Sequence, residues 1–260
     1  MAKTGTRLKA LSAGLTDVGR KRNHNEDSFL VDEELQLFVV ADGMGGHAGG
    51  GTASRLAVET IDREMRAAKN APERPFDSQT PLQDSPLPEY LRNAVEKACY
   101  EIFKAAQEDP RLAGMGTTTI ALCIHGDHAL FAHVGDSRAY LVRGDLIQQI
   151  SEDHSLVNEQ IKAGMITPEE AKHSRYKNII TRSVGFEEEV QVDVMGIVTE
   201  PNDFFILCSD GLANLVEDKE IRDVVQSGSL EEAPKKLIAL ANERGGDDNI
   251  TVIVVKTVAE

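Results

Sequence analysis

Four acidic segments lie far apart in this chain, and each adjoins an apolar run that predicts a β-strand. They are 25–27 (Asn-Glu-Asp), 41–47 (Ala-Asp-Gly-Met-Gly-Gly-His), 209–211 (Ser-Asp-Gly) and 246–249 (Gly-Asp-Asp-Asn). Strand ends arranged in this way can deliver several carboxylates to one point. Clustered carboxylates repel one another unless a divalent cation neutralises them, so we expect a hard-metal site.

The residue types also indicate which metal and which chemistry. Oxygen ligands without a matching set of histidines or thiolates select magnesium or manganese over zinc or copper, while calcium stays open although no EF-hand spacing is present. Two such ions about 3.5 to 4 Å apart can activate a bridging water for in-line attack on a phosphoryl group. Asp42 is the natural shared ligand, and Gly43 lets its carbonyl approach an ion. The alternative is an ordinary glycine turn that closes a strand.

Further polar residues fit such a site. Asp210 and Asp248 adjoin predicted strands and are followed by Gly and Asn, which tolerate tight turns. Arg22 can offer a bidentate fork to a phosphate monoester, unless it lies in a solvated basic turn. His47 can serve as a general acid, or as a hydrogen-bonding residue of its loop. The remaining histidines lack metal-ligand spacing and are predicted to be surface or structural: His24, His125, His128, His133, His154 and His173.

The apolar pattern predicts the elements that position these residues. A hairpin at 28–31 and 35–41 places Asp42 at a strand end. One face of a helix is marked by a four-residue spacing of Ala53, Ala57, Ile61 and Met65. Other helices are predicted at 89–107, 218–226 and 230–244, and strands at 117–124, 129–135, 139–143, 190–198, 203–208 and 250–256. The last strand is apolar on both faces, so we expect it to be covered on both sides. Strands in runs favour an α+β fold with antiparallel sheets.

Two segments are expected to be surface features. Residues 70–88 contain five prolines among polar residues, which predicts a surface loop without helix or strand. Residues 155–175 are polar with a helical pattern, and Thr167 followed by Pro168 is typical of a helix start. This second segment is predicted to be a lid.

Composition narrows the function classes. The chain has 260 residues with 28 Lys and Arg against 43 Asp and Glu, and the charge of −15 disfavours nucleic acid or an anionic membrane as main partner. Its apolar runs are shorter than the roughly 20 residues of a membrane-spanning helix, and no signal peptide is visible. Three scattered cysteines fit a reducing cytoplasm. A cysteine-based phosphatase is disfavoured because the positions six residues after them hold Ala105, Ala129 and Asn214.

The motifs together resemble the type 2C metal-dependent serine/threonine protein phosphatases (PPM family), in their bacterial branch. The resemblance covers about residues 13–255 and is carried by ordered motifs, namely Arg22-Asn23-His24-Asn25-Glu26-Asp27-Ser28, Asp42-Gly43-Met44-Gly45-Gly46-His47, Gly116-Thr117-Thr118, Gly135-Asp136-Ser137-Arg138, Ser209-Asp210-Gly211 and Asp248-Asn249. It implies a four-layer α-β-β-α sandwich with two central antiparallel sheets flanked by helices. It further implies one catalytic domain over 1–260, with a flap at about 155–185 that helps to choose substrates.

The resemblance also implies roles for individual residues. Asp42 would bridge two Mn²⁺ or Mg²⁺ ions, with the Gly43 carbonyl, Asp210 and Asp248 as further ligands. Asp136 together with Asp210 would hold a third, weakly bound ion. Asp27 would order the attacking water, Arg22 would bind the substrate phosphate, and His47 would be the general acid. Glu26 and Asn249 would contact these residues and hold them in place without binding an ion themselves.

Two departures from the family pattern concern the metals. Some relatives carry an aspartate where this chain has Asn214, which bears on the third ion. The run from Gly49 to Thr52 lacks a glutamate that is frequent there. Two other differences lie outside the metal ligands. The turn before His47 is longer than in animal relatives, and the 70–88 loop is expanded relative to the family pattern.

The implied activity is hydrolysis of phosphoserine and phosphothreonine in proteins by direct attack of a metal-activated water, without a phosphoenzyme. The implied partners are phosphorylated proteins, including bacterial serine/threonine kinases and their substrates, and the chain is expected to be a monomer. Three alternatives stay open on sequence grounds. They are a catalytically silent phosphoprotein-binding module, a domain that binds cations only for folding, and a phosphatase of small metabolites.

Overall fold

Two antiparallel β-sheets form the centre of the protein, whose computed structural model describes residues 8–45, 49–71 and 80–259. The first sheet has the order β1-β11-β10-β7-β8, with β1 (Leu8–Asp17), β11 (Ile250–Ala259), β10 (Phe204–Cys208), β7 (Arg138–Arg143) and β8 (Leu146–Gln149). The second has the order β2-β3-β5-β6-β9, with β2 (Asp27–Asp32), β3 (Leu37–Met44), β5 (Thr119–His125), β6 (His128–Val134) and β9 (Asp193–Val198). The short β4 (Gly116–Thr117) pairs with the end of β3.

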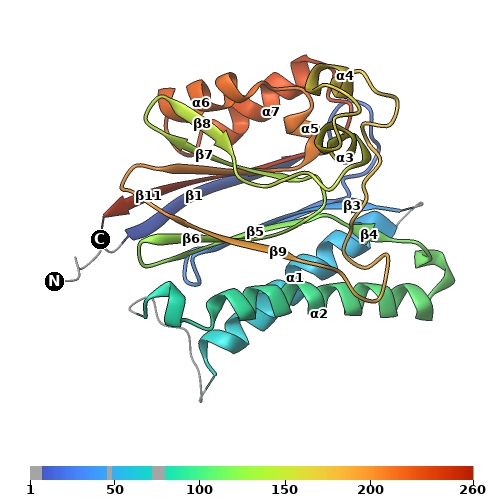
Figure 1. The fold of residues 1–260 in the computed structure, drawn as a ribbon, viewed down its shortest axis with the longest axis horizontal. Helices are drawn as coiled ribbons and strands as arrows, with labels where there is room; N and C mark the ends of the chain where they lie inside the picture. Colours follow the sequence, from blue (N-terminus) through green and yellow to red (C-terminus); the bar gives the residue numbers. More distant parts are fainter. Residues whose placement is uncertain (1–7, 46–48, 72–79, 260) are drawn as a thin grey trace.

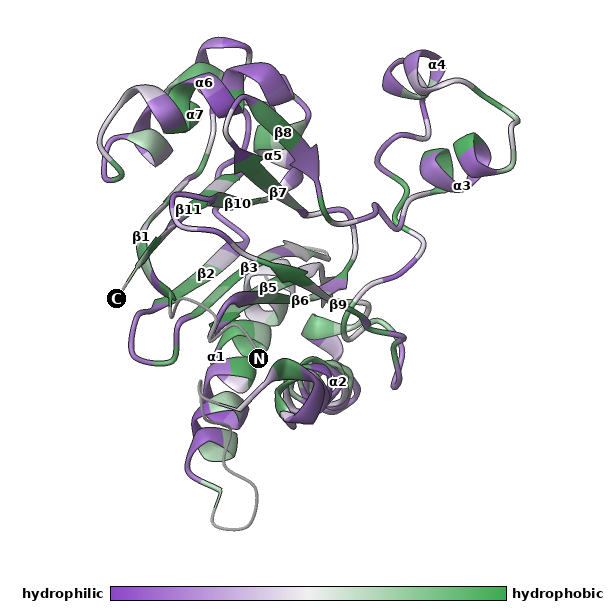
Figure 2. Ribbon diagram, turned by 60° about the vertical axis from the view of Figure 1, so that its left-hand side comes forward, coloured by the Kyte–Doolittle hydropathy of each residue, from purple (hydrophilic) through white to green (hydrophobic). Residues whose placement is uncertain are grey.

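Helices cover the outer face of each sheet and complete four layers (Figure 1). The long helices α1 (Gly49–Lys69) and α2 (Leu87–Glu108) lie on the second sheet. The first sheet is covered by α5 (Asp210–Ala213), α6 (Asp218–Ser227) and α7 (Ala233–Glu243). Two short helices, α3 (Leu156–Lys162) and α4 (Pro168–Lys172), project from the side of this sandwich (Figure 2). The predicted α-β-β-α sandwich of class α+β is confirmed.

Apolar side chains fill three spaces, one between the sheets and one under each helical layer. The strand β11 shows how the sequence specifies this arrangement. Val252 and Val254 pack with the helices over the first sheet, whereas Ile253 and Val255 point into the space between the sheets, and all four are fully buried. Burying each such side chain contributes about 1.5–3 kcal/mol. The expectation that this strand is covered on both sides is confirmed.

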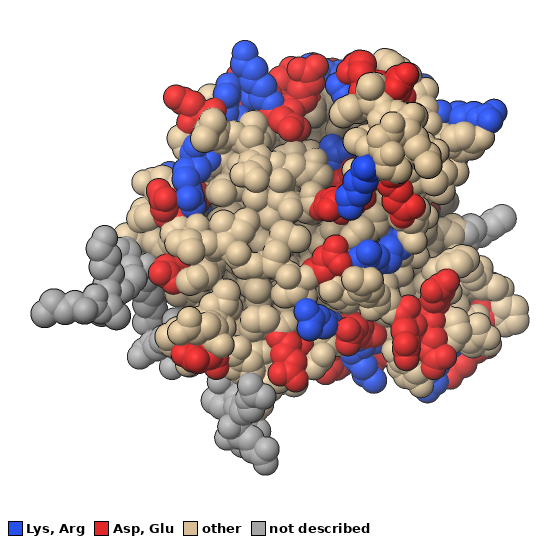
Figure 3. All heavy atoms as spheres, viewed as in Figure 1, with Lys and Arg blue, Asp and Glu red and all other residues tan. Residues whose placement is uncertain are grey.

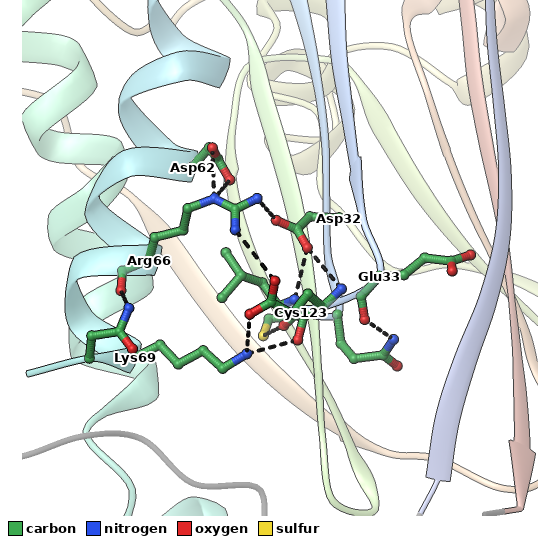
Figure 4. Close-up of polar contacts among 10 residues, drawn as sticks. Asp32, Glu33, Asp62, Arg66, Lys69 and Cys123 are labelled. Carbon is green, nitrogen blue, oxygen red and sulfur yellow. Dashed lines mark hydrogen bonds and ion pairs between the residues drawn. The ribbon is translucent and has the colours of Figure 1, made fainter.

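An ionic cluster ties α1 to the turn between β2 and β3. Asp32 is buried, and its carboxylate accepts hydrogen bonds from the backbone N–H groups of Glu34 and Leu35, both at 2.9 Å. Arg66 of α1 reaches this carboxylate and also contacts Asp62 one turn away (Figure 4). A buried carboxylate needs such partners to offset the loss of hydration. The cluster therefore fixes α1 on the hairpin whose other end carries Asp27 and Asp42.

Several local predictions differ from the structure. The expectation that residues 70–88 contain neither helix nor strand is wrong at the end of that range, because a 3₁₀ turn spans Leu82–Asp84 and α2 begins at Leu87. Pro88 is compatible with helix there because the first helical N–H groups need no intrahelical partner. The strands β1 and β8 and the helix α5 were not predicted. Four residues are too few for α5 to show a helical period.

The surface carries mixed charge on the face shown in Figure 3, where basic and acidic side chains lie close together around a broad area of other residues. Arg143 forms an ion pair with Glu200 at the surface (3.0 Å) and a second one with the buried Asp203 (2.6 Å). None of the described helices combines the length and the apolar composition that crossing a bilayer requires.

Candidate metal centre

The hairpin β2-β3 places Asp27 and Asp42 directly opposite each other on neighbouring strands. The backbone of Asp42 is held by two threonines of the Gly-Thr-Thr motif. Its N–H donates to Thr118 Oγ1 at 3.0 Å, and its C=O accepts from the Thr118 N–H at 2.9 Å and from Thr117 Oγ1 at 2.8 Å. These bonds fix the position from which the Asp42 carboxylate extends.

Asp27 has one oxygen bound and one free. Its Oδ2 accepts from Ser209 Oγ at 2.8 Å and from Thr251 Oγ1 at 2.6 Å, whereas Oδ1 is buried without a hydrogen-bond partner. Burial raises the pKa of Asp27 to about 7, and repulsion from Asp210 and Asp248 adds to this rise. A buried carboxylate with a free oxygen next to further carboxylates is suited to a cation or to a water bound there.

The neighbouring strands β10 and β11 bring Asp210 and Asp248 to the same end of the sandwich. Asp210 Oδ1 is a second buried oxygen without a partner, while its Oδ2 accepts from Asn214 Nδ2 at 3.1 Å. Burial raises the pKa of Asp210, with a further rise from Asp248. Burial also raises the pKa of Asp42 well above its ordinary value, followed by repulsion from Asp27 and Asp210. The four carboxylates thus share one electrostatic environment.

Gly43 lies where no side chain fits. A Cβ atom at this position would stand 2.1 Å from the Gly50 carbonyl oxygen and 2.5 Å from that of Glu26. The Gly43 N–H donates to the Glu26 carbonyl at 3.2 Å. Three backbone segments approach one another so closely at this position, next to Asp42, that only glycine fits.

Asn249 holds the loop before β2 against β11. Its side-chain oxygen accepts from the Glu26 N–H at 2.8 Å, and its amide nitrogen donates to the carbonyls of Val18 and His24, both at 2.9 Å. Arg22 of this loop pairs with Asp248 at 2.7 Å and remains half exposed. The structure therefore brings Arg22, Glu26 and Asn249 to the acidic centre.

Asp136 lies on the loop between β6 and β7 and reaches the same centre. It is buried, and burial followed by repulsion from Asp210 raises its pKa to about 7. Asp136, Asp210 and Asn214 are among the residues that line a groove of about 1020 Å³. The segment with α3 and α4 also lines this groove, through residues that include Ala171 and Lys177.

The case for a divalent cation rests on the two free buried oxygens and on the mutual repulsion of the carboxylates. In 8–45, 49–71 and 80–259, no three acidic, histidine or cysteine side chains are placed so that together they could hold a metal ion. The oxygens of Asp27 and Asp210 without partners, beside the half-buried Asp42, are nevertheless the donors that Mn²⁺ or Mg²⁺ prefers. The residues present thus fit such ions. His47, the expected general acid, lies outside the described residues.

Comparison with known proteins agrees with this geometry. Residues 19–247 match the family model described as "Protein phosphatase 2C". The chain belongs to the protein phosphatase 2C family. It is 40% identical over 245 residues to the protein phosphatase PhpP of Streptococcus pneumoniae, with 93% of this chain and 95% of that protein covered. It is 37% identical over 248 residues to the serine/threonine phosphatase stp of Listeria innocua, with 93% of each chain covered. The chain is thus a protein serine/threonine phosphatase.

Solved structures give the same family. The serine/threonine phosphatase PstP/Ppp of Mycobacterium tuberculosis superposes with a TM-score of 0.85 at 32% identity, covering 96% of this chain and 99% of that one. A PstP catalytic domain in complex with two manganese ions gives a TM-score of 0.83 at 34% identity, covering 96% and 99%. The phosphatase described here therefore has the fold and the metal dependence of this family.

Sequence reasoning missed the hydroxyl residues that hold the carboxylates. Ser209, directly after β10, and Thr251 of β11 bind Asp27 although both are far away in the sequence. Thr118 also contacts Ser137 through their hydroxyls at 2.7 Å. The available signal was the position of Ser209 directly before the Asp-Gly pair at a strand end. A hydroxyl next to an expected ligand is a natural partner for a second carboxylate.

Proposed function

We propose that this phosphatase hydrolyses phosphoserine and phosphothreonine in proteins at a centre of two Mn²⁺ or Mg²⁺ ions held by Asp42, the Gly43 carbonyl, Asp210 and Asp248. The observation that supports it most is the pair of buried carboxylate oxygens without partners, on Asp27 and Asp210, beside the half-buried Asp42. When bound, the two ions would supply an activated water and neutralise charge on the phosphoryl group. We also propose a weaker third ion at Asp136 and Asp210.

The residues around this centre have distinct tasks. Asp27 is held on one oxygen by two hydroxyl groups, so its other oxygen can accept a hydrogen bond from the attacking water and orient it. Arg22 uses one nitrogen on Asp248 and has further N–H donors for the substrate phosphate. Asn249 and Glu26 keep the Arg22 loop in place through the bond between them.

Direct attack by water agrees with the state of the cysteines. All three are buried, and burial raises the pKa of the Cys123 and Cys208 thiols to about 12 and also raises that of Cys99. A thiol in this condition is a poor nucleophile at neutral pH. A covalent phosphocysteine intermediate is therefore disfavoured.

We further propose that the chain acts as a monomeric, cytoplasmic catalytic domain spanning 1–260, with bacterial serine/threonine kinases and their substrates as partners. Phosphorylated kinase segments are suitable substrates because loss of the phosphate removes the charge pairing that orders them. The flap at 155–185 would contact the substrate, since part of it lines the groove next to Asp210.

The test is phosphate release from a phosphothreonine peptide with manganese and with EDTA. Wild type, Asp42→Asn and Asp210→Asn are compared with Asp109→Asn, a control at the C-cap of α2 whose carboxylate is paired with Arg111. We expect manganese-dependent turnover in wild type and in the control, and only background release in the two centre variants. A folded, manganese-loaded wild type without turnover would favour the silent binding module. A sugar phosphate that outcompetes the peptide would favour a metabolite phosphatase.

A further inference from the structure

His154 lies where the flap leaves the sandwich, between β8 and α3, and it is buried. It binds both backbone polar groups of Gly135. The Gly135 N–H donates to His154 Nδ1 at 3.0 Å, and the His154 N–H donates to the Gly135 carbonyl at 2.8 Å. Gly135 directly precedes Asp136, so the ring and the backbone of His154 fix the residue before a candidate metal ligand.

The same histidine binds the far end of the flap. Its carbonyl accepts from the Thr181 N–H at 2.9 Å, and the next residue, Ser155, forms an isolated β-bridge with Ile180. Its Nε2 lies 3.0 Å from Asp193 Oδ2, and the other oxygen of Asp193 accepts from Arg182 at 2.8 Å. The two ends of the flap therefore meet at His154.

The contacts define which ring nitrogen carries hydrogen. Because the Gly135 N–H points at Nδ1, that nitrogen must be an acceptor, and Nε2 carries the hydrogen that it donates to Asp193. The ring also stacks on His133 of β6, with ring centroids 4.8 Å apart. Its orientation is thus fixed from three sides.

The turn that carries Asp136 depends on this support. Gly135 has a φ of +109°, and a Cβ there would stand 2.6 Å from Thr118, so the turn is narrow and conformationally demanding. On the other side of Asp136, the hydroxyl of Ser137 contacts that of Thr118 at 2.7 Å. His154 holds the residue before Asp136, and Thr118 holds the residue after it. Thr118 also binds Asp42 directly, which links the turn to the main centre.

We propose that His154 is a positioning residue that couples the closed base of the flap to the placement of Asp136 opposite Asp210. It acts through Gly135 and does not contact the substrate or an ion. This inference rests on the proposed function, which makes Asp136 a ligand of the third ion. Opening of the flap base would release the Gly135 turn and weaken binding of a cation at Asp136.

Two substitutions separate the two ring contacts. In His154→Asn the side-chain oxygen can occupy the place of Nδ1 and accept from Gly135, but nothing reaches Asp193. In His154→Gln the amide nitrogen can occupy the place of Nε2 and donate to Asp193, but Gly135 loses its acceptor. His125→Gln is the matched control, because His125 is another buried histidine, bonded through Nε2 to the Thr80 carbonyl at 2.7 Å, at the opposite end of β5 from Thr119.

The first readout is amide hydrogen exchange in the full-length, EDTA-treated protein, which needs neither metal nor activity. We expect the Gly135 amide to exchange at least about tenfold faster in His154→Gln, and at nearly the wild-type rate in His154→Asn and His125→Gln. An unchanged Gly135 amide in His154→Gln would overturn the proposal.

The second readout is calorimetric titration with manganese. The weakest binding step, defined as the one that Asp136→Asn abolishes, should weaken about tenfold in His154→Gln while the tighter steps stay unchanged. In the Asp136→Asn background, His154→Gln should have no further effect on phosphopeptide turnover. Equal weakening of all steps, absence of an Asp136-dependent step in wild type, or a full effect in the double variant would each refute the coupling. A separate result would contradict the proposed function itself: wild type that binds manganese but releases no phosphate from the phosphopeptide.

Discussion

The raised pKa of Asp27 leads to a prediction about the metal-free protein. Burial, opposed by hydrogen bonds from Thr251 and Ser209 and assisted by Asp210, moves this pKa from the ordinary 3.8 to about 7. Between these two values the folded protein retains a proton that the unfolded chain has released. The free energy of unfolding therefore decreases as the pH rises through this window, and the decrease ends above about pH 7.

The size of the effect follows from the width of the window. Each pH unit changes the free energy of unfolding by about 1.4 kcal/mol for one proton bound in only one state. From about pH 5 to about pH 7, Asp27 accounts for a loss of about 3 kcal/mol. Asp136, whose pKa also rises to about 7, adds a loss of the same order. Saturating manganese should restore this stability, because the cation binds the ionised carboxylates of the folded state.

Urea unfolding of EDTA-treated protein at the two pH values tests the prediction. Asp27→Asn removes the titrating group. Between the two pH values, the free energy of unfolding of this variant should therefore fall by about 3 kcal/mol less than that of wild type. Asp109→Asn is the control, because Arg111 lowers the pKa of Asp109 to about 2, and this variant should follow wild type. Parallel pH dependences of wild type and Asp27→Asn would refute the reasoning.

Two further predictions concern the scaffold of the centre. Gly43→Ala places a Cβ 2.1 Å from a backbone oxygen of α1, so we expect calorimetry to show loss of manganese binding. Gly51→Ala is the control: its Cβ meets nothing closer than 3.7 Å, and it should bind manganese like wild type. Asp32→Ala leaves two backbone N–H groups and Arg66 without their buried partner, so the free energy of unfolding in urea should fall by about 3 kcal/mol. The more exposed Asp62→Ala should cost less than about 1 kcal/mol, and equal costs would contradict the role of the Asp32 cluster.

Local sequence information was sufficient for most elements. Helical spacing and apolar runs predicted α1, α2, α6 and α7 and the strands of both sheets except β1 and β8, because burial on one or both faces leaves a period in the sequence. Proline content misplaced the start of α2, since Pro88 occupies an early helical position where it is tolerated. The missed strand β1 is stabilised mainly by pairing with β11 over its whole length, which no local pattern reveals.

Residue types and their order along the chain were enough to predict the kind of site. Carboxylates at strand ends, the glycine next to Asp42 and the ordered motifs indicated a hard-metal phosphatase of this family, because residue chemistry and order are local properties. Which of these groups lie in contact depends on how the chain folds. The register of β2 and β3 sets Asp27 opposite Asp42, and the pairing of distant strands brings Ser209 and Thr251 to Asp27.

The histidines show the limit of local reasoning most clearly. His154 was predicted to be a surface or structural residue, and its bonds to Gly135, Thr181 and Asp193 arise only where the flap returns to the sandwich. Contacts between residues far apart in the sequence depend on loop closure and strand register. Those are set by the packing of the whole chain, so their consequences for the Asp136 turn could be derived only from the folded protein.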